Sequence, residues 1–172
     1  FYSFMGGGGL GNHRRSNSIL RNCLLVGNRA ITKNGGGVYC DHLGSLVILI
    51  ECVIYGNSAE NGGGVAAFSG RDANPVTIVD SKIYGNWAVK RGGGVFTEAV
   101  FNLTNSLICG NMAGDNGAGI YSEGAHTELR QCVIAENLSP QGSTLVCAHD
   151  PYSLSSSTLL ATNSIFWNPS GN

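Results

Sequence analysis

The 172-residue sequence predicts an all-β fold, a right-handed parallel β-helix of about six coils with three short strands in each. Three observations predict this class of fold. Landmark residues recur along the chain with one period, apolar residues alternate inside each repeat, and a run of glycines stands at the same place in successive repeats. Such repeats are typical of solenoids, in which each unit buries its apolar face by stacking on the next.

Two landmarks keep a common period of 25–30 residues. An asparagine after a glycine or glutamate recurs at gaps of 29, 29, 25 and 26 residues, and the apolar residue that closes each glycine run recurs at gaps of 28, 27, 30, 25 and 25. The asparagines are Asn28, Asn57, Asn86, Asn111 and Asn137, and the apolar residues are Leu10, Val38, Val65, Val95, Ile120 and Leu145. Each repeat is therefore expected to form one coil.

The first strand of each coil follows the glycine run, and the second and third strands are clearest in the segment PVTIVDSKIYGN (75–86). The residues of that segment expected to point inward are Val76, Ile78, Ser81 and Ile83. The alternation changes parity once, at Asp80, as a bend between two strands requires. Period-two alternation indicates strands with one buried face. The inward column of the third strand is Leu25, Ile54, Ile83, Ile108, Ile134 and Phe166.

The repeated glycines and asparagines are interpreted as corner residues rather than as flexible linkers. A glycine run that enters a strand suits a tight corner where Cβ atoms would clash. Asparagine tolerates a positive φ in a turn, and stacked asparagine amides can hydrogen-bond along the axis. The five landmark asparagines are therefore predicted to form a structural ladder. No GxxxxGK[ST] motif or helix follows a glycine run, so a phosphate-binding role is not expected.

Composition excludes several classes of protein. The formal net charge is −1 and the sequence pI is about 6.4, so no nucleic-acid partner is expected. No apolar run approaches the roughly 18 residues of a transmembrane helix, so no membrane insertion is expected. The six cysteines form no CxxC pair, which argues against zinc-ribbon and thioredoxin-like sites. No cofactor and no metal are expected.

One domain is expected over residues 1–172. Residues 1–5 are interpreted as an N-terminal leader or cap, residues 6–137 as regular coils, and residues 138–172 as a last coil with a longer loop. Open coil ends expose unpaired N–H and C=O groups. The N-terminal aromatic side chains therefore either cover the first coil or dock on another subunit. Head-to-tail stacking into a filament is the sharper hypothesis, and a monomeric piece of a longer stalk is its rival. The aromatic residues are Phe1, Tyr2 and Phe4.

The repeated I-x-G-N-x-A followed by G-G-G-V resembles the short repeats of bacterial polymorphic outer-membrane proteins and related pectate-lyase-like β-helices. Residues 54–59 (IYGNSA) with Gly62–Val65 carry the resemblance, together with their copies. The ending NSIFWN (163–168) is similar to the last coil of secreted surface β-helix proteins that carry a separate C-terminal anchor. The resemblance implies a bacterial, secreted or surface protein from families that include adhesins, autotransporter passengers and polysaccharide enzymes.

The strand after each glycine run carries the candidate binding residues on its outward side. Aromatic rings stack on the CH faces of sugars, and carboxylates hydrogen-bond to sugar hydroxyls. The candidate carbohydrate-binding residues are Tyr39, Asp41, Phe96, Glu98, Tyr121 and Glu123. Glu98 and Glu123 fall on adjacent coils, about 5 Å apart, which is the carboxyl spacing of a retaining glycosidase but also of every column in a stacked solenoid.

The catalytic residues of polysaccharide lyases do not carry over to this sequence. Those enzymes combine clustered calcium-binding carboxylates with a catalytic arginine or lysine, whereas the arginines here are scattered and no aspartate cluster accompanies them. The aspartate pairs of polygalacturonase-like hydrolases are also missing. No enzymatic activity is therefore expected, and a lyase or glycoside hydrolase is the alternative.

Histidines and cysteines each have a plain and a functional interpretation. Four histidines fall in the turn region after the glycine-run strand, where two on adjacent coils could hold a metal, although surface turn histidines are commoner. Three cysteines alternate with serines in one inward column, which indicates a small buried residue, and a Cys23–Cys52 disulfide is the alternative. The histidines are His13, His42, His126 and His149, and the column is Cys23, Cys52, Ser81, Ser106, Cys132 and Ser164.

Two N-x-S/T sequons occur, at Asn102 and Asn137. Asn102 points outward by parity and is the candidate glycosylation site, whereas Asn137 belongs to the corner ladder and is the poorer candidate.

Taken together, the residues predict a non-catalytic structural or adhesive β-solenoid, located outside the cell or on its surface, with a second copy of the chain as its expected partner. The second hypothesis is a carbohydrate-binding or carbohydrate-active β-helix with a polysaccharide partner. Ice binding is a third interpretation, but it needs a flat threonine array, and the outward Thr77, Thr104 and Thr162 are too few.

Overall fold

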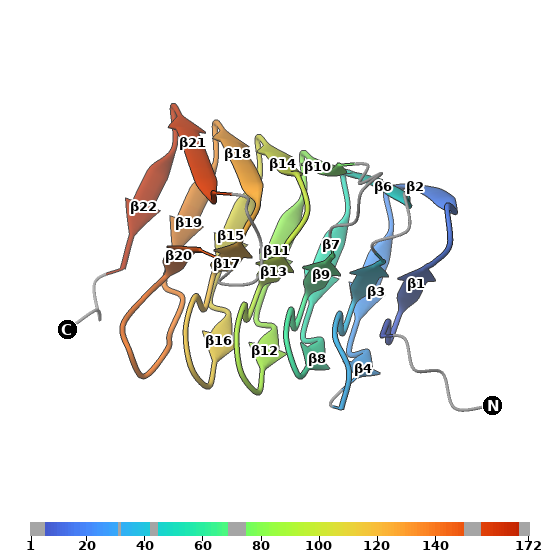
Figure 1. Ribbon diagram of the computed structural model, residues 1–172, viewed down its shortest axis with the longest axis horizontal. Coiled ribbons are helices and arrows are strands. Elements are labelled where there is room, and N and C mark those ends of the chain that lie inside the picture. The colour runs from blue at the N-terminus through green and yellow to red at the C-terminus, as the bar shows by residue number, and fades with distance from the viewer. Residues whose placement is uncertain (1–5, 31, 42–44, 69–74, 150–155, 169–172) are drawn as a thin grey trace.

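The computed structural model of the chain describes residues 6–30, 32–41, 45–68, 75–149 and 156–168. In these residues the chain winds coil upon coil, and each strand pairs in parallel with the equivalent strand of the next coil (Figure 1). The described residues form strands and turns without a helix, and thus without one long and apolar enough to cross a membrane. The predicted parallel β-solenoid is confirmed.

Four parallel sheets form the walls of the solenoid. Sheet A holds β1 (Leu10–Asn12), β5 (Val38–Cys40), β9 (Val65–Ala67), β13 (Val95–Thr97), β17 (Ile120–Glu123) and β20 (Leu145–Ala148). Sheet B holds β2 (Asn17–Arg21), β6 (Leu46–Ile50), β10 (Val76–Val79), β14 (Phe101–Thr104), β18 (His126–Arg130) and β21 (Thr158–Thr162). Sheet C holds β3 (Leu24–Val26), β7 (Val53–Tyr55), β11 (Lys82–Tyr84), β15 (Leu107–Cys109), β19 (Val133–Ala135) and β22 (Ile165–Trp167). Sheet D holds β4 (Arg29–Ala30), β8 (Ser58–Ala59), β12 (Trp87–Ala88) and β16 (Met112–Ala113).

Two details of the architecture differ from the sequence-based prediction. The described chain makes about five turns rather than six coils. Each regular coil also has a fourth wall, because a two-residue strand of sheet D follows the asparagine corner. Two residues are too short to show any alternation, which is why the pattern predicted only three strands per coil.

Apolar columns set the register of the stacked coils. Ile83 pairs with Ile54 on one side and with Ile108 on the other, so like residues lie above one another in the interior. The fully buried large side chains are Val38, Val47, Leu49, Ile54, Ile78, Ile83, Phe101, Leu103, Ile108, Ile120, Leu129 and Ile134. The alternation that predicted these inward positions therefore gave the correct face of the strands that hold them. Phe166, predicted in the inward column of the third strand, is instead 46% exposed in the last described coil.

A residue in the left-handed region makes the bend between sheets B and C. Asp80, where the alternation changes parity, has a φ of 50°. The equivalent residues have φ values between 47° and 54°, and they are Asn22, Glu51, Asp80, Asn105, Gln131 and Asn163. Short polar side chains dominate this column because Asn and Asp tolerate a positive φ better than other non-glycine residues.

The corner between sheets C and D turns one residue earlier than the sequence analysis expected. The ladder asparagines do not have a positive φ; the residue before each of them does, as at Gly56, where φ is 63°. The same corner holds Gly27, Gly56, Gly85, Gly110 and Glu136. This leaves the following asparagine free to point its amide into the coil.

The glycine runs lie where backbones of adjacent coils approach closely. A Cβ atom on Gly64 would lie 2.6 Å from the Gly94 carbonyl oxygen, and one on Gly63 would lie 2.4 Å from the Trp87 carbonyl oxygen. Contacts below 3.0 Å essentially never occur for real Cβ atoms. The runs are therefore close-packed entries to sheet A rather than flexible segments.

Candidate functional site

The landmark asparagines form a continuous hydrogen-bonded ladder along the axis. The Asn57 Nδ2 donates to Asn86 Oδ1 at 3.0 Å and to the Leu25 carbonyl at 2.7 Å, and the Asn57 N–H donates to the same Asn86 oxygen at 2.9 Å. The two bonds to the next amide oxygen recur at every step from Asn28 to Asn137. From Asn57 onward these side chains are at most 1% exposed. The structure thus joins all five asparagines in one ladder, with Asn28 partly exposed at its end and the other four buried.

A second ladder runs beside the bend between sheets B and C. Ser81 Oγ accepts the Cys52 N–H at 3.0 Å, and Ser106 Oγ accepts the Ser81 N–H at 3.0 Å. Cys52 and Ser81 are each 1% exposed. All six cysteines are free thiols, so Cys23 is not bridged to Cys52.

The aromatic candidates on sheet A form one stack, but they are buried. Tyr39 is 8% exposed, Phe96 is 4% exposed and Tyr121 is 7% exposed. The rings of Phe96 and Tyr121 stack with centroids 5.8 Å apart and planes 7° apart. Phe68 lies 5.5 Å from both Tyr39 and Phe96, and His13 lies 5.2 Å from Tyr39. The stack therefore links side chains from five successive coils.

Phe68 completes this stack from outside the predicted column. Ala66 occupies the register position of Tyr39 and Phe96, and its methyl group leaves room there. The Phe68 ring, two residues further along the chain, fills that room. The signal in the sequence is an alanine in an aromatic column followed two positions later by an aromatic residue, and it was not recognised.

The turn before each glycine run explains part of this burial. Gly62 begins the run with a φ of 63°, and a Cβ there would lie 2.3 Å from the Val65 carbonyl oxygen and 2.8 Å from the Ala66 Cβ. The turn thus lies against the outer side of sheet A at the start of each strand. With under a tenth of each aromatic residue exposed, the ring faces of Tyr39, Phe96 and Tyr121 are not accessible to a sugar.

Arg91 lies over the far end of the stack. Its guanidinium carbon is 5.0 Å from the Tyr121 ring centroid, and its Nη1 is 3.3 Å from Glu123 Oε2. Burial raises the pKa of the Tyr121 hydroxyl, an effect that the Arg91 charge opposes and the Glu123 charge reinforces. Because Thr97 and Ser122 are register partners, the next residues, Glu98 and Glu123, occupy neighbouring coils. Arg91 supplies a positive charge beside the Glu123 carboxylate.

The Asp41 carboxylate stabilises the fold through hydrogen bonds within the protein. The residue is 4% exposed, and its carboxylate accepts the Arg14 N–H at 3.0 and 3.2 Å and the Ser45 hydroxyl at 3.0 Å. Arg14 and Arg15 are consecutive left-handed residues, with φ values of 56° and 65°. The carboxylate therefore holds a strained turn, with His13 Nδ1 3.6 Å away.

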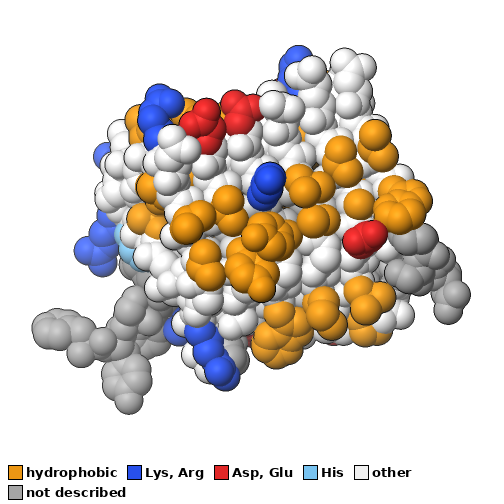
Figure 2. Space-filling model, turned by 180° about the vertical axis from the view of Figure 1, so that it is seen from behind, with side chains coloured by type: hydrophobic (Ala, Val, Ile, Leu, Met, Phe, Trp, Pro, Cys, Tyr) orange, Lys and Arg blue, Asp and Glu red, His pale blue; other side chains and the backbone are white. Residues whose placement is uncertain are grey.

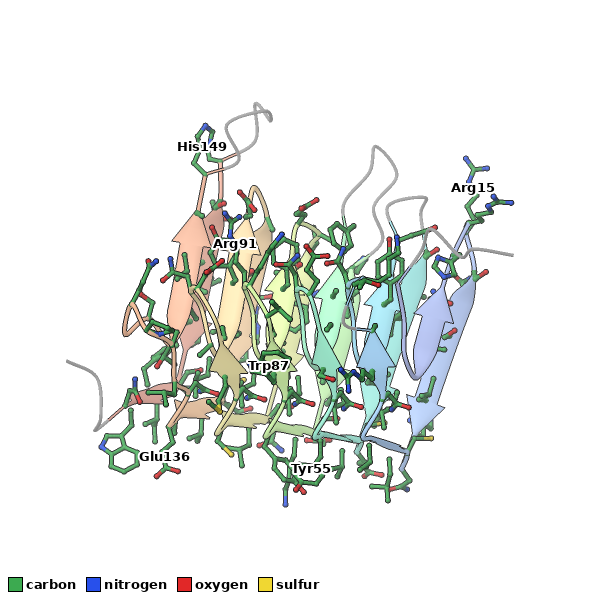
Figure 3. The ribbon with its side chains drawn as sticks, turned by 90° about the horizontal axis from the view of Figure 1, so that it is seen from below. Arg15, Tyr55, Trp87, Arg91, Glu136 and His149 are labelled. Carbon is green, nitrogen blue, oxygen red and sulfur yellow. The ribbon has the colours of Figure 1, made fainter. Side chains whose placement is uncertain are left out.

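The structure does not assemble the histidines into a metal site. His42 lies outside the described residues, and His126 Nδ1 is hydrogen-bonded to the Thr158 hydroxyl at 2.6 Å. His149 and Arg15 mark opposite ends of the molecule in Figure 3, so His149 is remote from His13. In the part of the chain that the structure describes, no group of three or more His, Cys, Asp or Glu residues could hold a metal ion.

The two sequons differ in their surroundings. Asn102 lies in β14, partly exposed on the outer side of sheet B, between Thr77 and Glu128. Asn137 is 1% exposed within the ladder. Glycosylation at Asn102 stays a prediction.

Exposed hydrophobic side chains gather on another side of the molecule, over sheets C and D (Figure 2). Ten of the fourteen exposed large hydrophobic residues in the described chain lie there: Leu24, Val26, Tyr55, Val133, Ile165, Phe166 and Trp167 on sheet C, and Trp87, Met112 and Leu138 on sheet D and its continuation. A shallow cavity of about 380 Å³ lies between Trp87, Met112, Leu138 and Pro140. This surface was not predicted from the sequence, because the aromatic and carboxylate pairs that indicate a binding site lie on sheet A.

No family model, curated protein or solved structure matches this chain. The β-solenoid architecture that the resemblance implied is present, and membership of the pectate-lyase-like or polymorphic outer-membrane families is left as a proposal.

Proposed function

We propose that the protein is a non-catalytic structural or adhesive β-solenoid of the cell exterior, built as a stiff rod whose outer sheets meet other molecules. The short repeats that resemble bacterial polymorphic outer-membrane proteins support a bacterial, secreted or surface location. The interior of the molecule supports the role as a rod, and its outer faces support the adhesive role.

The observation that carries the proposal is the buried asparagine ladder. Each amide from Asn57 to Asn111 both accepts from one neighbouring coil and donates to the other. Bending the rod or separating two coils would leave buried donors and acceptors unpaired, at about 1–3 kcal/mol for each group. A continuous ladder of this kind favours resistance to deformation, which is what a structural element needs.

The polar groups of sheet A also support a structural role. Asp41 is used to hold a turn, Glu123 is paired with Arg91, and the aromatic rings pack on one another. These side chains satisfy each other within the protein. An enzyme site, in contrast, usually keeps such groups accessible in a concave pocket.

A carbohydrate site is the second candidate, and one observation favours it. The Arg91 side chain is 44% exposed beside the Tyr121 ring and Glu123. A partly exposed guanidinium next to a carboxylate can hydrogen-bond to an acidic sugar. We place this alternative at the Glu98–Glu123 end of the stack.

Affinity electrophoresis in gels that contain acidic or neutral polysaccharides separates the two candidates. The structural role predicts that wild type, Glu98→Gln and Glu123→Gln migrate alike in every gel and release no reducing or unsaturated sugar. Glu128→Gln, in β18 of sheet B, is the matched control. Retardation or cleavage by the wild type that both site variants lose and the control keeps would establish the carbohydrate function instead.

End-to-end stacking of subunits is the form of assembly that the sequence predicts for such a rod. Electron microscopy of the protein at neutral pH tests it. Filaments with an axial repeat near one subunit length, roughly 30 Å for the six stacked strands of a sheet at about 4.8 Å each, are expected from stacking. Isolated short rods would contradict it and leave the structural role of the single rod untouched.

A further inference from the structure

We propose that the outer face of sheet C is a docking surface for a second copy of this chain, which packs on it face to face. The inference deepens the proposed structural role, on which it rests, because it names a partner and the surface that binds it. It concerns the side of the rod and is independent of end-to-end stacking.

The face is apolar in the middle of the molecule. Its two outward columns run through Val53, Lys82, Leu107 and Val133, and through Tyr55, Tyr84, Cys109 and Ala135. Tyr55 is 43% exposed and Val133 is 36% exposed, although coils lie on both sides of them. The outward column of sheet B is apolar at Ile48 and polar in the next three coils, at Thr77, Asn102 and Glu128. An apolar face of this extent marks an interaction surface.

The surface is also flat enough for another sheet. The rings of Tyr55 and Tyr84 stack with centroids 4.6 Å apart, so they lie along the rod. Tyr55 leans over the next corner, since a Cβ on Gly85 would lie 2.9 Å from its Cε2 atom. Glycine at three neighbouring corners adds no side chain to the rim; these are Gly56, Gly85 and Gly110. Two flat faces can therefore approach to the roughly 10 Å separation of packed sheets.

Two opposite charges identify the second copy as the occupant. Lys82 lies one coil before Cys109, at the start of its strand, and Glu136 lies one coil after it, beyond the end of its strand. Both charges act on the Cys109 thiol, whose pKa is raised first by burial and then by Glu136, and lowered by Lys82. Tyr55 and Glu136 project from the same side of the molecule (Figure 3). A twofold axis that passes beside Cys109 brings Lys82 of each copy onto Glu136 of the other, which is the self-complementarity that an isologous dimer needs.

The area of the face sets the strength of this contact. Sheet C has six strands that lie about 4.8 Å apart and are about 10 Å long, which gives roughly 300 Å², and sheet D adds roughly 130 Å². That total lies within the range of functional surface patches but is about half of the roughly 800 Å² that each partner buries in a standard interface. The pairing is thus a weak, reversible dimer, suited to rods held side by side at high local concentration.

Sedimentation velocity over a range of concentrations tests the pairing. The wild type is expected to move from monomer to dimer as concentration rises. Leu107→Asp, in the centre of the face, is expected to stay monomeric, whereas Thr104→Asp, outward on sheet B of the same coil, is expected to associate like the wild type. A wild type that stays monomeric to about 1 mM, or a Leu107→Asp variant that still associates, would overturn the proposal.

Charge reversal tests the predicted orientation. Lys82→Glu and Glu136→Lys each replace two attractions in the dimer by repulsions, so each variant should weaken association about tenfold at low salt. The double variant Lys82→Glu/Glu136→Lys should restore it. Weakening without restoration would overturn the twofold arrangement through Cys109.

Alkylation of the protein's own cysteines tests which face is covered in the dimer. Cys109 lies on the docking face, and Cys147 is exposed on sheet A, away from it. Alkylation of Cys109, followed by peptide mass spectrometry, should slow as concentration rises while alkylation of Cys147 stays constant. Association with unchanged Cys109 alkylation would mean that another surface is used. That result would not affect the structural role, which the polysaccharide assay and the rod shape test separately.

Discussion

At the scale of single residues, asparagine suits the ladder because its amide both donates and accepts. Asn86 Oδ1 accepts two bonds from Asn57, while its Nδ2 donates to Asn111 and to the Ile54 carbonyl. Aspartate would accept without donating, and its buried charge would be unpaired. Each side chain in a ladder of identical residues has to donate and to accept, so it must carry an amide or a hydroxyl group. The Ser81–Ser106 ladder is built from hydroxyl groups.

Cys40 makes a prediction about alkaline pH. The residue is 2% exposed, and its pKa is raised from 9.0 to about 11, chiefly by burial. Between these pH values the folded protein keeps a proton that the unfolded chain releases. The contribution of the protonated Cys40 thiol to the free energy of unfolding is complete below pH 9. It is lost as pH rises through 11, and the total loss is about 2–3 kcal/mol. Cys40→Ala should therefore lose less stability than the wild type between pH 8 and pH 10.5.

Urea unfolding under reducing conditions at the two pH values measures this difference. Burial raises the pKa of Tyr39 and Tyr121 as well, so part of the alkaline loss should persist in Cys40→Ala. Cys147→Ala, which removes an exposed thiol, is the control and should behave like the wild type. Equal alkaline losses in Cys40→Ala and the wild type would show that the Cys40 thiol is not the cause.

At the scale of strands and turns, the sequence predicts what has a period and misses what depends on contacts between segments. Alternation fixes which face of β10 and β11 is buried, because a one-residue slip would turn every side chain over. Neither the two-residue strands of sheet D nor the ring of Phe68 in the gap over Ala66 has a periodic signal. The burial of the sheet A candidates also depends on turns that fold over the strands, so outward parity did not mean exposure.

The two kinds of glycine in one repeat should respond differently to alanine. Gly56 has a φ of 63° and open space around its Cβ position, so Gly56→Ala should cost only the left-handed strain, about 1–2 kcal/mol. Gly64→Ala places a Cβ 2.6 Å from the Gly94 carbonyl oxygen and should cost about 3 kcal/mol or more. Urea unfolding of both variants checks the order.

A third variant separates conformation from space at the same corner. Gly56→Asn should cost less than Gly56→Ala, since asparagine enters the left-handed region more readily. Equal losses of stability in Gly56→Ala and Gly64→Ala would mean that the coils can separate locally around Gly64, which would contradict the close packing of the glycine runs.

At the scale of the whole molecule, the ladders connect coils that share no direct contact. Asn57 and Asn111 are two coils apart, about 10 Å along the axis, and both bind Asn86. Nearest-neighbour contacts alone would make distant coils independent, as in an ideal repeat array. A polarised chain of buried amides instead makes each bond depend on the next.

A double-mutant cycle measures this axial coupling. Asn57→Ala and Asn111→Ala should each cost about 2–4 kcal/mol, because each leaves buried partners unpaired. The double variant should cost less than the sum by about 0.5–1 kcal/mol, since Asn86 is free to relax once either neighbour is gone. The pair Asn57→Ala with Asn102→Ala, on the outer side of sheet B, should be additive within about 0.5 kcal/mol. Additivity in both pairs would show that the ladder is a series of independent bonds, and the stiffness of the rod would then rest on the sheets alone.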